Sequence, residues 1–217
     1  MKSPKLALVA VAVAAVVSLG ACSSNKKDTA GSGAAVTPVA NLTSLSGKAT
    51  SVTLDPGFLS ALTSLKLTPG VVGKATLTGA VISFPITGGN VKYFTPGSTT
   101  PYVQGIIHHA GSGLSLTAGG KKVELTDFDV DPGMSILTGK VTVDGTVAVA
   151  SAPLFFLDGR TLNPLASEVD GTGTATLEGT TVSITPEAAA LLNKTFGTTA
   201  VTPFFKVGIA KIVVNTK

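Results

Sequence analysis

Apolar and polar side chains alternate most regularly in residues 113–125, GLSLTAGGKKVEL. A period of two places successive apolar side chains on one face of a β-strand. The pair Gly119–Gly120 supplies the positive φ angles that a two-residue hairpin turn requires. This turn puts Leu116 opposite Val123. We therefore predict a hairpin in which four apolar side chains share one face: Leu114, Leu116, Val123 and Leu125.

A second alternating segment, residues 139–150, reads GKVTVDGTVAVA. A two-residue turn at Asp144–Gly145 would put the valines before the turn and those after it on opposite faces, because a shift of one residue reverses the faces of a strand. A three-residue loop over 144–146 keeps all of them on one face. We therefore predict that longer loop, with four valines on one side: Val141, Val143, Val147 and Val149.

The alternation changes phase after Leu125, because Phe128 and Val130 no longer match it. A β-bulge near Thr126 or Asp127 would restore the phase. Valine- and threonine-rich runs between Gly and Pro residues predict further strands. These strands are expected near residues 71–77, 80–84, 90–94, 104–108, 154–157, 173–177 and 207–214.

Two segments carry the signals of a helix start, and they resemble each other. VTLDP ends at Pro56 and VSITP ends at Pro186, so that Asp55 and Thr185 each precede a proline. Asp and Thr are good N-caps, and Pro is well tolerated at the first helical position. Each segment therefore predicts a strand, a short helix and a second strand. Gly197 is expected to end the second helix.

The fold class follows from these elements. Residues 47–217 are rich in Val, Thr, Leu and Gly, and the chain contains no Trp. About 170 residues make one domain of ordinary size with a substantial core. We predict an all-β fold, a single β-sandwich or barrel-like domain with two short helices that cover its ends or one side.

The N-terminus has the layout of an export signal. Lys2 and Lys5 precede the uncharged apolar run 6–20, which is short for a membrane span. The run ends in Leu-Gly-Ala-Cys at Cys22, which resembles the lipobox of bacterial lipoproteins. The resemblance implies that residues 1–21 are removed and that Cys22 carries lipid such as palmitate. The alternative is that Cys22 is an ordinary cysteine of a discarded signal peptide.

Residues 22–46 are expected to form a flexible tether after the lipidated cysteine, because small and polar residues dominate and cannot bury enough apolar area to fold. The predicted location is the outer face of the cell membrane. Removal of Lys2 and Lys5 lowers the formal charge from +4 to +2, and Arg160 is the only arginine. The lysines are scattered and aromatic residues are few, which argues against nucleic acid as a partner.

Candidate ligand-binding residues are His108, His109, Tyr93 and Tyr102. Neighbours on a strand point to opposite faces, so the two histidines could bind one metal only if the strand ended at Ala110. The other interpretation is that they are solvent-exposed residues at a strand end. The tyrosines flank a Gly/Pro/Thr-rich loop, where aromatic side chains are either contact residues or partly core.

Three carboxylates, Asp127, Asp129 and Asp131, have the spacing of the start of a calcium loop. Pro132 replaces the glycine that this loop needs, and the twelfth position is Thr138, so we expect no metal site. A charged strand edge that discourages edge-to-edge pairing is the favoured interpretation. The chain lacks the common catalytic motifs of serine and metal hydrolases, which argues against an enzyme.

Residues 105–132 and 182–198 resemble HtaA-type domains of actinobacterial haem-uptake proteins. The first segment has a Gly–apolar–His–Gly pattern followed by a Leu-rich strand and a strand that ends near Asp-Pro. The second has an apolar–Thr stretch before an Ala-rich helix. The resemblance implies a β-rich surface domain, and haem binding by a tyrosine with a histidine partner. No motif assigns that tyrosine to Tyr93 or Tyr102.

These observations favour a membrane-anchored, non-catalytic surface lipoprotein that binds an envelope protein or glycan or has a structural role. The alternative is a carrier of haem or of another small apolar ligand. A deep apolar cavity would favour the carrier, whereas a filled core with exposed loops would favour the binding module. A Ser or Asp beside His108 or His109 in a cleft would instead favour a hydrolase.

Overall fold

The computed structural model describes residues 35–167 and 173–216. The predicted signal peptide, Cys22 and the first part of the predicted tether lie outside the described residues. The folded unit begins at Val36, earlier than the predicted boundary at residue 47. Residues 40–42 form a strand, and Leu45 is buried in the core, which ties this segment to the domain. No helix among the described residues has the length and apolar character needed to cross a bilayer.

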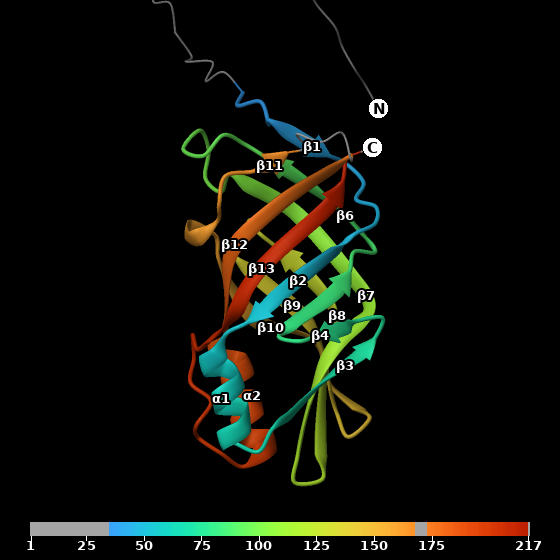
Figure 1. Ribbon diagram of the computed structural model, residues 1–217, viewed down its shortest axis with the longest axis vertical. Coiled ribbons are helices and arrows are strands. Elements are labelled where there is room, and N and C mark those ends of the chain that lie inside the picture. Colours follow the sequence, from blue (N-terminus) through green and yellow to red (C-terminus); the bar gives the residue numbers. More distant parts are fainter. Residues whose placement is uncertain (1–34, 168–172, 217) are drawn as a thin grey trace, which may run out of the picture. The chain divides into compact units, whose positions relative to one another are not determined.

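The domain is all-β, as predicted, and its strands form one curled antiparallel sheet (Figure 1). The strands before residue 100 are β1 (Ala40–Leu42), β2 (Ala49–Leu54), β3 (Thr68–Gly73), β4 (Thr76–Thr78), β5 (Val81–Pro85) and β6 (Gly88–Tyr93). The later strands are β7 (Val103–Ala118), β8 (Lys121–Asp131), β9 (Ile136–Val143), β10 (Thr146–Asp158), β11 (Ala166–Ser167), β12 (Thr174–Ile184) and β13 (Lys206–Asn215).

The strand order explains how the sheet encloses an interior. It runs β1-β6-β7-β8-β9-β10-β12-β13-β2-β5-β4, and β3 pairs with the second half of β7. Because β3 leads directly into β4, the chain connects the β4 end of this order to β7, the third strand from its other end. The sheet therefore curls around a core of Val, Leu, Ile and Phe side chains, of which Val123 and Val141 are fully buried.

The two predicted helices are present and begin where expected. Helix α1 (Pro56–Ser64) is capped by Asp55, which accepts a hydrogen bond from the Gly57 amide. Helix α2 (Pro186–Phe196) is capped by Thr185 and ends at Gly197 in the left-handed conformation. Figure 1 shows both helices at the same end of the sheet. A short 3-10 helix, η1 (Gly159–Thr161), follows β10.

The first predicted hairpin is confirmed in its register. Leu116 lies opposite Val123 and Leu114 opposite Leu125, across the turn at Gly119–Gly120. The predicted bulge is also present, because the β8–β9 register shifts between Thr126 and Asp129. Alternation and turn chemistry agree in this segment, which is why the sequence determined both features.

The predicted three-residue loop in the second hairpin is wrong. Thr146 pairs with Val143, so the turn has two residues, Asp144 and Gly145, both with positive φ. This conformation suits a two-residue hairpin turn, and the Asp144 carboxylate also accepts a hydrogen bond from the Lys122 amide at 2.7 Å. A register shift after Val147 then corrects the phase, leaving Val147 55% exposed.

The internal sequence similarity extends to a strand and a helix but no further. β2 and β12 lie on either side of β13, and each leads into one of the helices. The strands that follow the helices differ, because β13 pairs with β12 and β2 whereas β3 pairs with β7. The two ends of the domain are therefore equivalent only in their strand–helix units.

Candidate functional site

The inside of the curled sheet contains an apolar cavity of about 400 Å³, here called chamber 1. Its walls come from strands on all sides of the sheet. The wall side chains are mainly aliphatic or aromatic and include Val52, Phe84, Ile107, Phe128, Leu157, Val182 and Ile212. Ligand pockets in proteins typically measure about 300–1,000 Å³ and have such walls with a few polar groups. Chamber 1 is therefore a candidate binding site for a small molecule.

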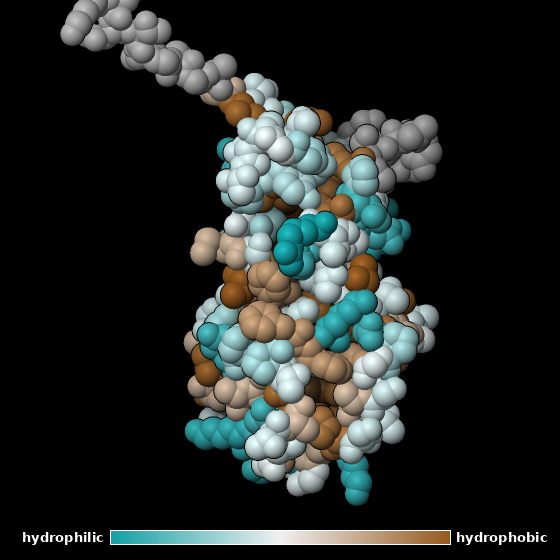
Figure 2. Space-filling model, turned by 90° about the vertical axis from the view of Figure 1, so that its left-hand side faces the viewer, coloured by the Kyte–Doolittle hydropathy of each residue, from teal (hydrophilic) through white to brown (hydrophobic). Residues whose placement is uncertain are grey.

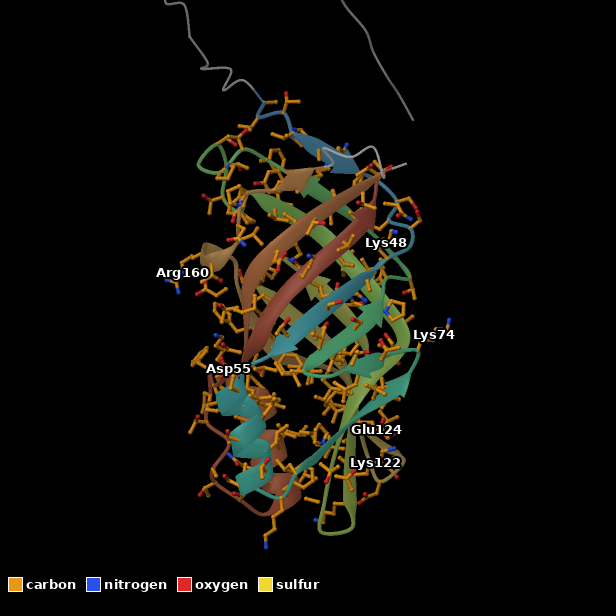
Figure 3. All side chains as sticks on the ribbon, viewed as in Figure 1. Lys48, Asp55, Lys74, Lys122, Glu124 and Arg160 are labelled. Atoms are coloured by element: carbon orange, nitrogen blue, oxygen red, sulfur yellow. The ribbon has the colours of Figure 1, made fainter. Side chains whose placement is uncertain are left out.

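Most polar residues of chamber 1 lie at a rim formed by loops, and Thr50 on β2 and Thr180 on β12 are the polar wall residues outside it. Three loops form this rim, at residues 100–102, 132–135 and 158–162, and they include exposed residues such as Thr100 and Arg160. Arg160 is 87% exposed and points away from the domain (Figure 3). Its guanidinium donates two hydrogen bonds to Asp158, at 2.9 and 2.8 Å, and this partner lowers the pKa of Asp158. The rim therefore carries an ion pair of zero net charge.

A second apolar cavity of about 310 Å³, chamber 2, lies between the two helices and the sheet. Its wall contains no ionisable side chain among the described residues, and its only polar side chains are Ser115 and Thr202. Five residues line both chambers, so that one layer of side chains separates them: Leu54, Ile82, Leu114, Phe155 and Val207.

His109 and His108 lie inside β7 rather than at a strand end, and they point to opposite sides of it. His109 is 1% exposed. The carbonyl of Pro85 can only accept, so His109 Nδ1 donates to it at 3.0 Å. Nε2 therefore accepts from the Thr50 hydroxyl at 3.1 Å. Burial is the main cause that lowers the pKa of His109. This neutral, fully bonded ring connects β7 to β2 and to the end of β5.

His108 is on the outer side, with its side chain 42% exposed. Its Nδ1 lies 2.6 Å from a carboxylate oxygen of Asp129 on the neighbouring strand β8. Neither chamber includes His108 or His109 in its wall. The pair of His108 and Asp129 therefore lies outside the walls of the two chambers.

The two tyrosines lie together, and only one of them reaches the cavity. Tyr93 is buried, and its ring meets that of Tyr102 edge to face with centroids 5.9 Å apart. Tyr102 lines chamber 1 and donates from its hydroxyl to the Gly159 carbonyl at 3.0 Å. Burial, and secondarily the nearby Tyr93, raise the pKa of Tyr102.

The described residues do not fit a haem iron in either chamber. Iron in haem proteins is bound by His, Cys, Met or Tyr. Tyr102 is the only described wall residue of these types. Its phenol is already hydrogen-bonded, and its raised pKa opposes the phenolate form. Both ring nitrogens of His109 also have partners.

The three carboxylates of β8 do not form a metal site. Asp127 is paired with Lys140 and Asp129 with His108, while Asp131 accepts from the Met134 amide. The pKa of Asp127 is lowered, first by its contact with Lys140. Among the described residues there is no group of three His, Cys, Asp or Glu that could hold a metal ion. The charged-edge interpretation is wrong, because β8 pairs with both β7 and β9.

Apart from Tyr102, sequence reasoning did not identify the residues that form the chambers as site residues. Phe128 and Phe155 were expected only as apolar strand residues, and Arg160 only as the single arginine. An apolar side chain that faces a cavity has the same sequence pattern as one that packs against a neighbour.

Comparisons with known proteins support the fold. No family model matches the sequence, and no curated protein matches it. The chain is similar to the crystal structure of the C-terminal domain of HtaA from Corynebacterium glutamicum, with a TM-score of 0.52 and 11% identity, over 81% of this chain and 98% of that one. A domain-swapped dimer of a histidine-to-alanine variant of that domain gives a TM-score of 0.47 and 12% identity, over 74% and 91% of the two chains. The described domain therefore has the all-β fold of the HtaA C-terminal domain.

Proposed function

We propose that this protein is a non-catalytic carrier of an apolar small molecule, held inside the curled sheet. The observation that carries the proposal is chamber 1, an apolar cavity of about 400 Å³ whose polar groups lie mainly at its rim. The hydroxyl of Thr50, a wall residue on β2, is turned toward His109. A much smaller apolar cavity, of about 150 Å³, is already enough to bind benzene in an engineered protein. A deep cavity favours the carrier over a binding module with a filled core.

The hydrogen bonding of the interior agrees with an apolar ligand. No buried side-chain nitrogen or oxygen in the described parts of the chain lacks a partner. A site built for a polar molecule needs unpaired donors or acceptors, because these give the ligand its orientation. In chamber 1, the groups that could bind a polar ligand lie mainly at the rim. Haem is the ligand that the HtaA resemblance implies, and it stands as the alternative to be tested beside the apolar probe.

The location is proposed from the N-terminus. Leu-Gly-Ala-Cys after an apolar run supports lipidation at Cys22, which would hold the protein on the outer face of the cell membrane. Replacement Cys22→Ser should move the protein from the membrane fraction to the soluble fraction and remove the lipid mass. A variant that stays in the membrane fraction with its lipid would contradict the proposal.

The binding proposal is tested with the full chain carrying Cys22→Ser and with the apolar fluorophore N-phenylnaphthylamine. Saturable binding at one site is expected. Ala210→Leu should weaken it about tenfold or more, because Ala210 is 5% exposed and its added atoms would enter chamber 1. The matched control is Lys211→Leu, on the same strand with its side chain 49% exposed.

Equal binding by both variants and the parent would place the probe outside chamber 1 and contradict the proposal. Haemin is added in parallel, and its Soret band should show no shift of the kind that an axial ligand causes. A stoichiometric Soret shift that Tyr102→Phe abolishes would favour the haem alternative.

A further inference from the structure

We infer that the ligand is a long straight-chain amphiphile, such as a fatty acid or another single-chain lipid, whose tail extends from chamber 1 into chamber 2. This inference rests on the proposed function and specifies its ligand class. It depends on three features of the described residues: the two chambers adjoin, their polarity differs, and the dividing layer consists of apolar side chains.

The two chambers adjoin along a single layer of side chains. Leu54, Leu114 and Phe155 are among the residues that line both of them. A ligand that reaches the end of chamber 1 therefore meets side chains whose other surfaces face chamber 2. Aliphatic side chains change rotamer at low cost compared with backbone movement. A thin, flexible chain needs only such changes to pass, whereas a wide rigid ring system needs the strands to separate.

The two chambers differ in polarity. The rim of chamber 1 carries the Arg160–Asp158 ion pair and the Tyr102 hydroxyl. Chamber 2 has helix α1 and helix α2 on one side and strands on the other, with leucine as its commonest wall residue. The polar end of an amphiphile therefore meets polar groups and water at the rim, and its tail meets a mostly apolar surface beyond the layer, where Ser115 and Thr202 are the polar exceptions among the described residues.

The electrostatics of the rim indicate that the tail, rather than a charged head group, determines selectivity. Asp158 and Arg160 neutralise each other, and their hydrogen bonds at 2.8 and 2.9 Å leave no unpaired charge directed at the cavity. Each methylene moved from water into the chambers should then strengthen binding about fourfold. Affinity should stop rising when the tail reaches the end of chamber 2.

The apolar surface near the rim agrees with this class of ligand. Figure 2 shows apolar side chains gathered in the middle and lower parts of the face to the left of Figure 1. Phe156 lines chamber 1, and its ring meets that of Phe204 edge to face at 6.1 Å. Phe204 is 62% exposed, and Met134, in a rim loop, is 74% exposed.

The test measures how well saturated fatty acids from octanoic to palmitic acid displace N-phenylnaphthylamine from the full chain carrying Cys22→Ser. Affinity should rise about fourfold per methylene and then level off. Ala61→Phe adds bulk from α1 to the wall of chamber 2. It should lower the affinity for palmitic acid about tenfold or more and change that for octanoic acid less than about twofold. Ser60→Phe, exposed on the same helix, is the matched control.

The outcomes separate this inference from the proposed function. If the fluorophore binds but fatty-acid affinity does not rise with chain length, or Ala61→Phe has no effect on palmitic acid, the inference is wrong and the cavity carrier stands. If neither the fluorophore nor any fatty acid binds, both are wrong. Ala61→Leu, a smaller change with the same expected direction, replaces Ala61→Phe if thermal unfolding shows that the larger side chain prevents folding.

Discussion

The stability of the domain should depend on pH through the buried ring of His109. The ring is 1% exposed and neutral, with Nδ1 donating to Pro85 and Nε2 accepting from Thr50. Burial lowers the pKa of this ring below its ordinary value of 6.5, whereas the unfolded chain keeps the ordinary value. Below that pH the unfolded state therefore binds a proton that the folded state does not bind.

The sign and size of the effect follow from proton linkage. Above the ordinary pKa of 6.5 neither the folded nor the unfolded state holds this proton. In that range His109 therefore contributes no pH dependence to the free energy of unfolding. As the pH falls below that value, the free energy of unfolding decreases by up to about 1.4 kcal/mol per pH unit. The decrease continues until the pH reaches the lowered pKa of the folded ring. Protonated Nε2 would also require the Thr50 hydroxyl to turn from donor to acceptor.

The assay is denaturant unfolding of the parent chain and of His109→Gln, between about pH 4.5 and 7.5. Glutamine keeps a donor for the Pro85 carbonyl but does not titrate, so the variant should be less stable yet lack most of this slope. His108→Gln is the matched control, because it changes the neighbouring histidine, which bonds to Asp129. It leaves the contacts of His109 with Thr50 and Pro85 intact, so the slope assigned to His109 should remain. A parent chain whose stability is flat below pH 6.5, or a His109→Gln chain with the same slope, would refute the reasoning.

Two further substitutions test the packing, and both are measured by denaturant unfolding. Thr185→Ala should lower the free energy of unfolding by about 2 kcal/mol, because the hydroxyl of this buried cap bonds both to α2 and to β10. This loss should exceed that caused by Asp55→Ala at the exposed cap of α1. A smaller loss at Thr185 would contradict this. Gly139→Ala should destabilise by about 1–3 kcal/mol, because the new Cβ would lie 2.7 Å from the Phe128 ring and 2.9 Å from Leu154. An unchanged denaturant midpoint for Gly139→Ala would contradict this, because it would show that Phe128 and Leu154 can move aside without loss of stability.

Much of the fold could be predicted because local signals agree with one another. Asp55 and Thr185 before proline marked both helices, and the Gly119–Gly120 turn fixed the register of its hairpin. The prediction for residues 139–150 was wrong because alternation alone was used. The turn conformation of Asp144 determined the loop, and a bulge then restored the phase.

The candidate site could be predicted only in part. The sequence pointed to Tyr102, which does line chamber 1, but also to His108 and His109, which do not. Neighbours on a strand point to opposite faces, yet the sequence does not say which face of a curled sheet is the inside. The chambers depend on the combined volume of side chains from many strands, and no short segment of sequence contains that information.

The most direct test of the account is native mass spectrometry of the full chain carrying Cys22→Ser, purified without detergent or added ligand. The account predicts a bound apolar species with the mass of a long-chain amphiphile, which Ala210→Leu reduces and Lys211→Leu leaves unchanged. A clean apo mass that takes up neither fatty acid nor haemin would contradict the carrier function. Stoichiometric haemin uptake alone would contradict the assignment of the ligand.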